Sequence, residues 1–446
     1  MLAVAGSLAM ALAGCGTARD VSRQDVVLQW VRETTTPVAT VGPNDTETPL
    51  TDTAGLAAVD ELVADATVVG LGESAHGLGD QFVVRQRLAR YLVEEHGYRT
   101  IAFEEDYGSG VAIDRYITEG VGNPRELVGS MVAAWRSEQM LGFVEWMRDF
   151  NQGHPEDPVR FLGTDVTQLR QLSFDELTRY ASAVAPGRVD ELAAHLDAIA
   201  LRGSPGEQIG WLFEHPDQEG LVEHARAVRD LVAELPQPRT EAETAERADM
   251  ERHAAAVLGF YLNYTGRDPD FRDRVMADTL RGWQEQTRSP AIYWAANVHV
   301  AAASRVDYNF PPTEMGAQLV PAGHHLRETY GEHYVPIAAV FGSARVLQGW
   351  ETGQPAVYDV PAPGEDTLDH ILHRAGTEAF LLDLTTSAPP PVTDWLHEPA
   401  RMRLIGAAYD EAQDADYSMR LDSLVDGFDA VVYLSRTGEA ELLSDE

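Results

Sequence analysis

Short apolar runs and amphipathic stretches alternate along most of the chain. Residues 67–72 form a short apolar run, residues 79–96 carry apolar side chains at helical spacing, and residues 100–103 form a second apolar run. Gly97 follows the last periodic residue of the middle stretch, at a position where glycine commonly ends a helix. The spacing predicts a strand, a helix and a second strand, which together make a βαβ unit with parallel strands.

Further apolar runs of strand length follow, separated by helical patterns. They are residues 159–163, 291–295, 335–340, 379–384, 403–408 and 430–434. A first helix is predicted near residues 22–34, and the pattern between residues 168 and 288 is almost all helical, with breaks at 204–219 and 236–242. The expected fold class is α/β, with a mostly parallel sheet flanked by helices and a largely helical insertion at about 168–288.

Composition and charge exclude several classes of partner. With 446 residues and 44% hydrophobic side chains, the chain can bury the core of one large domain or of two ordinary ones. It has 34 Lys and Arg residues against 71 Asp and Glu residues, which gives a net charge of −37. Because phosphate groups are bound mainly by Lys and Arg, this excess argues against nucleic acid and against electrostatic docking on anionic lipid.

The start of the chain has the pattern of a targeting segment. Residues 1–14 are small or apolar and uncharged, and the run is too short to span a bilayer, which needs roughly 20 residues. It ends in Leu12-Ala13-Gly14-Cys15, which resembles the lipobox of bacterial and archaeal lipoproteins. The resemblance implies a signal over residues 1–14, lipid on Cys15 and a tether over 15–23. The expected location is extracytoplasmic, with the lipid anchor as the attachment to the cell membrane.

Polar side chains come directly after four of the predicted strands. In chain order they are Glu73 and His76, then Glu104 with Glu105 and Asp106, then Asp165, and finally Asn297 and His299. Because ligands of parallel α/β sheets bind beyond the carboxyl ends of the strands, these side chains are expected to meet in one crevice. Arg85 lies within the first two turns of the predicted helix and can offer a fixed cation to the same crevice.

Histidine chemistry fits this pattern better than a serine nucleophile. Imidazole titrates near neutral pH, and Glu73, three residues before His76, can orient its ring. Ser74 misses the last glycine of the Gly-x-Ser-x-Gly elbow. Glu73, His76, Glu104 and His299 are also plausible metal ligands, although the chain has no His-Glu-x-x-His motif and no cysteine cluster. Taken singly, each of these side chains is more often structural than functional.

The motifs resemble those of the erythromycin esterase-like proteins. The resemblance rests on Leu71-Gly72-Glu73-Ser74-Ala75-His76-Gly77, the helix with Arg85, Phe103-Glu104, Gly163-Thr164-Asp165 and Trp294-Ala295-Ala296-Asn297-Val298-His299. It covers roughly residues 24–440 and implies one hydrolase domain over residues 24–446. Ala75 stands where the family usually has threonine, so a hydroxyl beside His76 is missing.

The resemblance implies hydrolysis of an ester or of a macrolide lactone by activated water, without a metal or another cofactor. It implies that His76 is the general base and that Glu73 and Glu104 place the base and the water. Arg85 and His299 would stabilise or position the substrate carbonyl.

The expected partner is a small-molecule ester or lactone, and Asp165 and Asn297 are expected to contact it. Two other functions stay open at this point. One is a metal-dependent hydrolase that uses the same side chains. The other is a non-catalytic envelope protein whose crevice binds a small ligand such as a macrocycle or haem.

Overall fold

The computed structural model describes residues 22–39, 53, 55–311, 314–349 and 354–444 of the chain. The predicted signal segment, Cys15 and most of the predicted tether lie outside the described residues. Within the described ranges, no helix combines the length and the apolar character needed to cross a bilayer.

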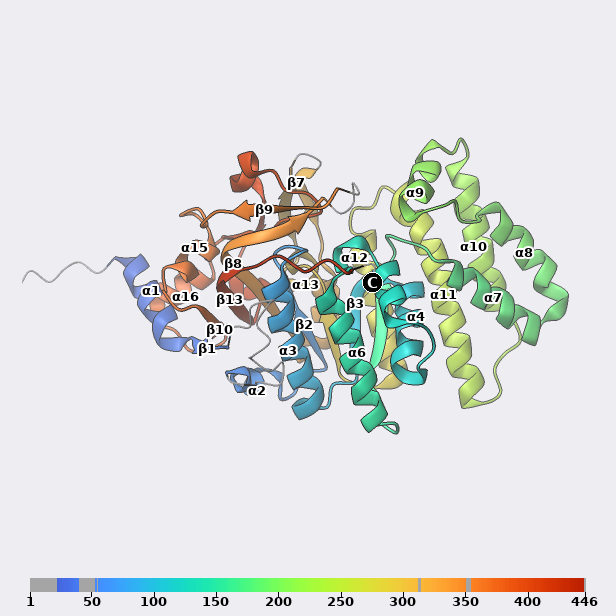
Figure 1. The fold of residues 1–446 in the computed structure, drawn as a ribbon, viewed down its shortest axis with the longest axis horizontal. Coiled ribbons are helices and arrows are strands. Elements are labelled where there is room, and N and C mark those ends of the chain that lie inside the picture. Colours follow the sequence, from blue (N-terminus) through green and yellow to red (C-terminus); the bar gives the residue numbers. More distant parts are fainter. Residues whose placement is uncertain (1–21, 40–52, 54, 312–313, 350–353, 445–446) are drawn as a thin grey trace, which may run out of the picture.

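A large central sheet organises the molecule, in the strand order β1-β10-β13-β8-β2-β5-β3-β4, and β9 pairs with the second half of β8 (Figure 1). From β13 to β4 the neighbouring strands run parallel, whereas β1, β10 and β9 pair antiparallel. The bounds are Thr36–Pro37 (β1), Val68–Leu71 (β2), Thr100–Asp106 (β3), Arg160–Asp165 (β4), Ala291–Trp294 (β5), Tyr334–Gln348 (β8), Ala356–Val360 (β9), Ala379–Asp383 (β10) and Ala430–Thr437 (β13). The predicted α/β class with a mostly parallel sheet is confirmed.

The predicted βαβ unit is present, but its two strands are not neighbours. Strand β5 lies between β2 and β3 and pairs with both of them in parallel. Its four residues are all buried, which suits a strand at the centre of a parallel sheet. The connecting helix α3 spans Gly79–His96, and Gly97 ends it with a positive φ of 72°.

Helices cover both faces of the sheet. Successive strand residues point to opposite faces, and since both sets are apolar, both faces must be buried. Ile101 and Phe103 pack toward α3, α4 (Tyr107–Glu119), α5 (Pro124–Ser130) and α6 (Glu138–Gly153). Ala102 packs on the opposite face. The elements there are α1 (Arg23–Thr34), α12 (Phe271–Thr287), α13 (Asn297–Val300), α14 (Ala322–Tyr330), α15 (Leu368–His373), α16 (Pro390–Leu396) and α17 (Leu424–Gly427).

Between β4 and β5 the chain is helical, and most of these helices share a separate core. They are α7 (Gln171–Val184), α8 (Val189–Ala198), α9 (Pro205–Glu214), α10 (Gln218–Glu234) and α11 (Glu241–Thr265), and they lie together at one end of the molecule (Figure 1). The predicted break at 204–219 is wrong over most of its length. Ser204 and Glu207 form a capping box there and Pro205 occupies the first turn, so these residues start α9.

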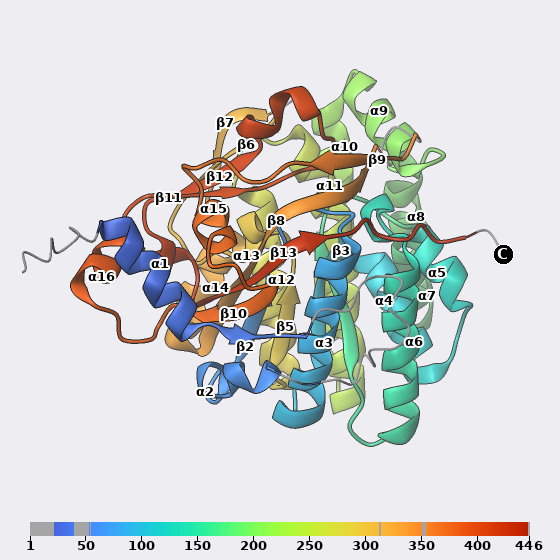
Figure 2. The same ribbon diagram turned by 60° about the vertical axis from the view of Figure 1, so that its left-hand side comes forward.

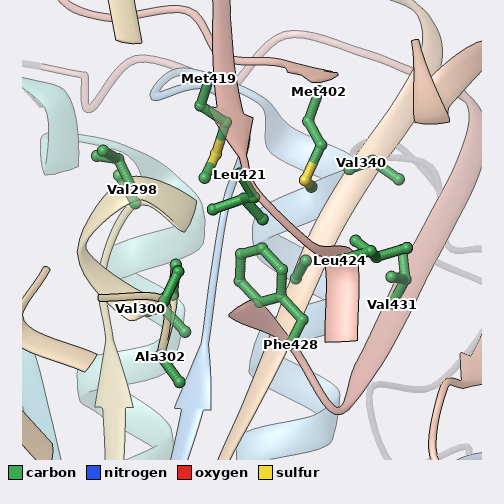
Figure 3. Packing of buried hydrophobic residues seen from close by; sticks show 14 of the residues in the cluster. Val298, Val300, Ala302, Val340, Met402, Met419, Leu421, Leu424, Phe428 and Val431 are labelled. Atoms are coloured by element: carbon green, nitrogen blue, oxygen red, sulfur yellow. The ribbon is translucent and has the colours of Figure 1, made fainter. Parts of the chain in front are cut away.

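A smaller antiparallel sheet, in the order β11-β12-β6-β7, was not predicted (Figure 2). Its strands span Ala400–Arg403 (β11), Ser418–Leu421 (β12), Val306–Phe310 (β6) and Glu314–Leu319 (β7). The predicted strand at 403–408 is wrong beyond Arg403, because Ile405 leaves this sheet to form a bridge with Ala75. Figure 3 shows Met402 and Met419 of this sheet in one cluster with Val298 of α13.

Candidate active site

The loop after β2 holds a histidine against two charged side chains. His76 Nδ1 lies 2.5 Å from Glu73 Oε1, and Arg85 Nη2 donates to the other oxygen, Glu73 Oε2. Glu73 and Arg85 are buried, whereas 18% of the His76 side chain is exposed. The Arg85 guanidinium also lies over the Trp294 ring, 4.4 Å from its centroid. The imidazole is therefore the member of this trio that solvent reaches.

The loop is fixed by its neighbours. The Gln81 side chain on α3 accepts from the Ser74 backbone N–H at 3.1 Å and donates to the Ser74 hydroxyl at 3.0 Å. Ile405 donates its backbone N–H to Ser74 O. Gly77 has a φ of 80°, and a Cβ there would lie 2.2 Å from the Leu347 carbonyl oxygen. Only glycine fits at this turn, which directly follows His76.

Glu104 reaches the same region from the end of β3. The register between β3 and β4 shifts between Phe103 and Asp106, which indicates a bulge at this point. Glu104 Oε2 accepts from the Ala296 N–H at 2.9 Å, and Glu104 Oε1 lies 2.7 Å from Arg272 Nη2. Because β5 lies between β2 and β3, Glu104 and Glu73 approach from either side of it.

Arg272, which no sequence pattern singled out, connects the polar strand ends. It lies in the first turn of α12, and it donates to the two oxygens of Asp165 at 2.9 and 2.6 Å and to Glu104. Its Nη1 lies 3.1 Å from His299 Nε2. A helix that precedes a parallel strand runs opposite to it, so its first turn lies at the edge where the strands end. This rule, applied to the helix before β5, points to the first turn of α12.

His299 is directed at this cluster by the short helix α13. Val298 and Val300 on either side of it pack into the hydrophobic core (Figure 3). His299 Nδ1 lies 2.8 Å from Asp273 Oδ1, and Nε2 lies 3.5 Å from Glu104 Oε1. The structure thus places His299 next to Glu104, as the strand-end argument expects, and adds Asp273 as a second carboxylate partner.

Asp165 and Asn297, the expected substrate contacts, are both engaged within the protein. Asp165 is 2% exposed, and besides Arg272 its carboxylate accepts from the Val166 N–H at 2.7 Å. The Asn297 amide donates to Ala339 O at 2.8 Å and accepts from Ala339 N–H at 3.1 Å. These bonds tie α13 to β8 and Asp165 to Arg272, and contact with a substrate stays a prediction for both residues.

Strand β3 runs three residues beyond the predicted apolar run, so Glu105 and Asp106 are its last two residues; both are buried and point elsewhere. Asp106 accepts from the Ser109 N–H and so caps α4, and it also accepts from Arg170 at 2.7 Å. Glu105 accepts from the Val132 N–H at 2.8 Å. Burial and the neighbouring Asp106 raise the pKa of Glu105 well above its usual range. These residues are not a solvated acidic turn.

Charges shift the site's titrating groups in opposite directions. Burial lowers the pKa of His76, but the charge and hydrogen bond of Glu73, together with the charge of Glu104, outweigh it and leave the pKa raised. Burial raises the pKa of Glu104, but His299, Arg272 and His76 outweigh it and leave the pKa lowered. The carboxylate form of Glu104 and the protonated form of His76 are therefore both favoured. Within the described part of the chain, no group of three or more His, Cys, Asp or Glu side chains is placed to hold a metal ion.

Residues 93–437, well over half of the chain, match the model of a family described as Erythromycin esterase. The chain belongs to the erythromycin esterase family. The matched range includes Glu104, Arg272 and His299, and it begins after the loop with Glu73 and His76.

Similar proteins carry esterase and hydrolase names. The Escherichia coli protein "Erythromycin esterase type II" is 30% identical over 106 residues, which are 24% of this chain and 25% of that enzyme. The chain thus spans about a quarter of the length of that relative. The Bacillus subtilis (strain 168) protein "Putative hydrolase YbfO" is 23% identical over 359 residues, 74% of this chain and 77% of that protein. The family and these relatives support the assignment of the chain as a hydrolase.

A solved structure shares the fold. It is a mutant of the erythromycin esterase EreC in its open conformation, with a TM-score of 0.64 and 19% identity. The likeness covers 87% of this chain and 95% of that one.

Proposed function

We propose that this hydrolase cleaves an ester or lactone bond of a small molecule with water activated by His76. One observation carries the proposal: a partly exposed imidazole is held at Nδ1 by a buried carboxylate that a buried arginine fixes from the other side. That arrangement defines the orientation and the tautomer of a general base. The names of the family and of its members favour an ester or lactone as the substrate.

The geometry supports a simple course of proton transfer. With its Nδ1 proton donated to Glu73, His76 exchanges protons with water at Nε2. The water gives a proton to Nε2 as its oxygen bonds to the carbonyl carbon, and the protonated imidazole returns the proton to the leaving alkoxide as the ester bond breaks. Among the residues that the structure describes, Arg85 Nη1 is buried without a hydrogen-bond partner. This N–H group suits the oxyanion that forms on the carbonyl oxygen.

The test is turnover of a panel of esters and lactones by purified protein. His76→Asn should lower turnover by about 10²-fold or more, because the substitution removes the base. His154→Asn is the matched control, since His154 is an exposed histidine at the end of α6 that contacts Phe150 O. Near-normal turnover in His76→Asn removes His76 from the mechanism.

Two further outcomes distinguish the alternatives. If chelation abolishes turnover and added zinc or manganese restores it, the metal-dependent hydrolase replaces the proposal. Tight binding of a macrocycle or haem without turnover of any ester favours the non-catalytic envelope protein.

A further inference from the structure

Charged groups from several elements surround His299. Arg272 and Asp273 come from the first turn of α12, Glu104 from the end of β3 and Asp165 from the end of β4. The histidine itself is 6% exposed. Because so little water reaches the ring, these groups decide which nitrogen of the imidazole carries a proton.

The two ring nitrogens face partners of opposite hydrogen-bonding character. Nδ1 lies 2.8 Å from Asp273 Oδ1, and a carboxylate accepts hydrogen bonds, so Nδ1 carries the proton. Nε2 lies 3.1 Å from Arg272 Nη1, and a guanidinium donates hydrogen bonds, so Nε2 presents its lone pair. The neutral tautomer with hydrogen on Nδ1 satisfies both contacts, whereas the other tautomer satisfies neither.

Asp273 is itself held rigidly. Its Oδ1 also accepts from the backbone N–H of Ala322 at 2.8 Å, and Ala322 is the first residue of α14. The Asp273 residue is 2% exposed. The carboxylate therefore has a fixed place between the start of α14 and the imidazole, and it cannot turn away from the ring without losing a buried hydrogen bond.

We infer that Asp273 is a positioning residue that fixes the Nδ1–H tautomer of His299 and so makes Nε2 its proton-exchanging atom, beside Glu104. When Nε2 gains a proton, it loses the hydrogen bond from Arg272 and faces Glu104 Oε1, which lies 3.5 Å away. His299 can thus hold a proton at one defined point of the site. The tautomer follows from the contacts alone. The effect of this tautomer on the rate of hydrolysis rests on the proposed function.

The charges around the ring predict the direction in which a substitution acts. Burial lowers the pKa of His299, but Asp273 and Glu104 raise it, Arg272 lowers it, and the net result is a raised pKa. Removing the charge of Asp273 takes away one of the raising influences. Asp273→Asn should therefore move the titration of His299 to lower pH.

The experiment is nitrogen NMR of imidazole-labelled protein across a pH titration. The chain has 14 histidines, so His299→Gln identifies the His299 signals by their loss. In the unmutated protein, above its titration, Nδ1 should be protonated and Nε2 bare. In Asp273→Asn the midpoint should shift to lower pH. Asp270→Asn is the matched control, because Asp270 lies one turn earlier and accepts from the Val320 N–H at 2.8 Å. It should leave the His299 signals unchanged.

Each result bears on the inference. A proton on Nε2 in the neutral ring of the unmutated protein overturns it, as does an unchanged midpoint in folded Asp273→Asn. If Asp273→Asn does not fold, the tautomer of the unmutated protein still decides. In a hydrolysis assay, Asp273→Asn should lower kcat by at least about tenfold and shift the pH profile, and Asp270→Asn should do neither. If no ester is hydrolysed, the proposed function fails while the NMR result stands on its own.

Discussion

Arg272 lies at the start of a helix on the surface, where substitutions usually cost little stability. Replacing it by Met should nevertheless destabilise the protein strongly. The substitution leaves Asp165, which is 2% exposed, and Glu104, which is 5% exposed, without their shared cation. Removing one partner of a buried ion pair costs about 3–5 kcal/mol, and since 27% of the Arg272 side chain is exposed we expect the lower end, about 3 kcal/mol.

Arg274→Met is the matched control. Arg274 lies two residues further along α12 and pairs with Asp268 at 2.6 Å, with 42% and 48% of the two side chains exposed. Exposed pairs contribute less than about 1 kcal/mol to the free energy of unfolding. The two variants therefore remove the same group from the same helix, and they differ in the burial of the carboxylates left behind.

The pH dependence of the loss tests its cause. Burial raises the pKa of Asp165, but the charge and hydrogen bond of Arg272 outweigh it, so the pKa is lowered. The carboxylate of Asp165 stabilises the fold above its unfolded pKa of about 4, and this stabilisation is lost as the pH falls through the lowered folded pKa. Without Arg272, the destabilisation should be largest at neutral pH and shrink toward acid.

Urea unfolding of the three proteins over a range of pH measures this effect. Equal losses in Arg272→Met and Arg274→Met would refute the reasoning, and so would a loss in Arg272→Met that grows as the pH falls. Arg272→Lys adds a check of geometry, because it keeps the charge but cannot make both contacts to Asp165.

Three further outcomes are expected. The pKa of His76 is raised, mainly by Glu73, despite burial, and a general base must be neutral to act. We therefore expect kcat/KM to rise with pH through a midpoint above about 6.5. A fall of kcat/KM over that range contradicts His76 as the base. Asn297→Ala removes two buried hydrogen bonds to Ala339 and should lower the free energy of unfolding, measured with urea, by about 2 kcal/mol. An unchanged urea midpoint would show that these bonds between α13 and β8 do not stabilise the protein. The lipobox-like pattern predicts that Cys15→Ser shifts the protein from the membrane fraction to the medium or leaves it unprocessed; mass spectrometry that finds an intact Met1 and unmodified Cys15 in the native protein rules out the anchor.

The inner strands of the central sheet could be predicted because they are buried on both faces, whereas the largely exposed β1 and β9 were not predicted. The sequence of such a strand is a short apolar run, and the expected bounds of β2 and β5 lie within one residue of those observed. The small sheet could not be found in this way. In β6 (Val306–Phe310) apolar and polar residues alternate and only the first residue is buried, so the strand contains no apolar run, and its alternation is the signal that could have found it.

The polar strand ends, and the first turn of α12, were predictable from topology, but the contacts between them were not. Glu104 lies near the end of β3 and His299 follows β5, and the rule for parallel sheets brings them to one edge. Arg272 and Asp273 lie in a helix whose length and apolar face are apparent but whose neighbours are not. Their contacts depend on β5 entering the sheet between β2 and β3, and local periodicity does not specify strand order. The sequence therefore predicted part of the candidate site without the groups that connect it.

The position of β5 in the sheet has a consequence for how the protein is made. Strands β2 and β3 leave the ribosome early, yet their shared neighbour begins at Ala291, after all the helices α7–α12. Until that residue is synthesised, the two strands have unpaired edges facing a missing strand, and the emerging chain has exposed backbone that other chains can pair with. We expect fragments that end before residue 291 to aggregate and to depend on chaperones, and we expect the central sheet to complete only late in translation or after it.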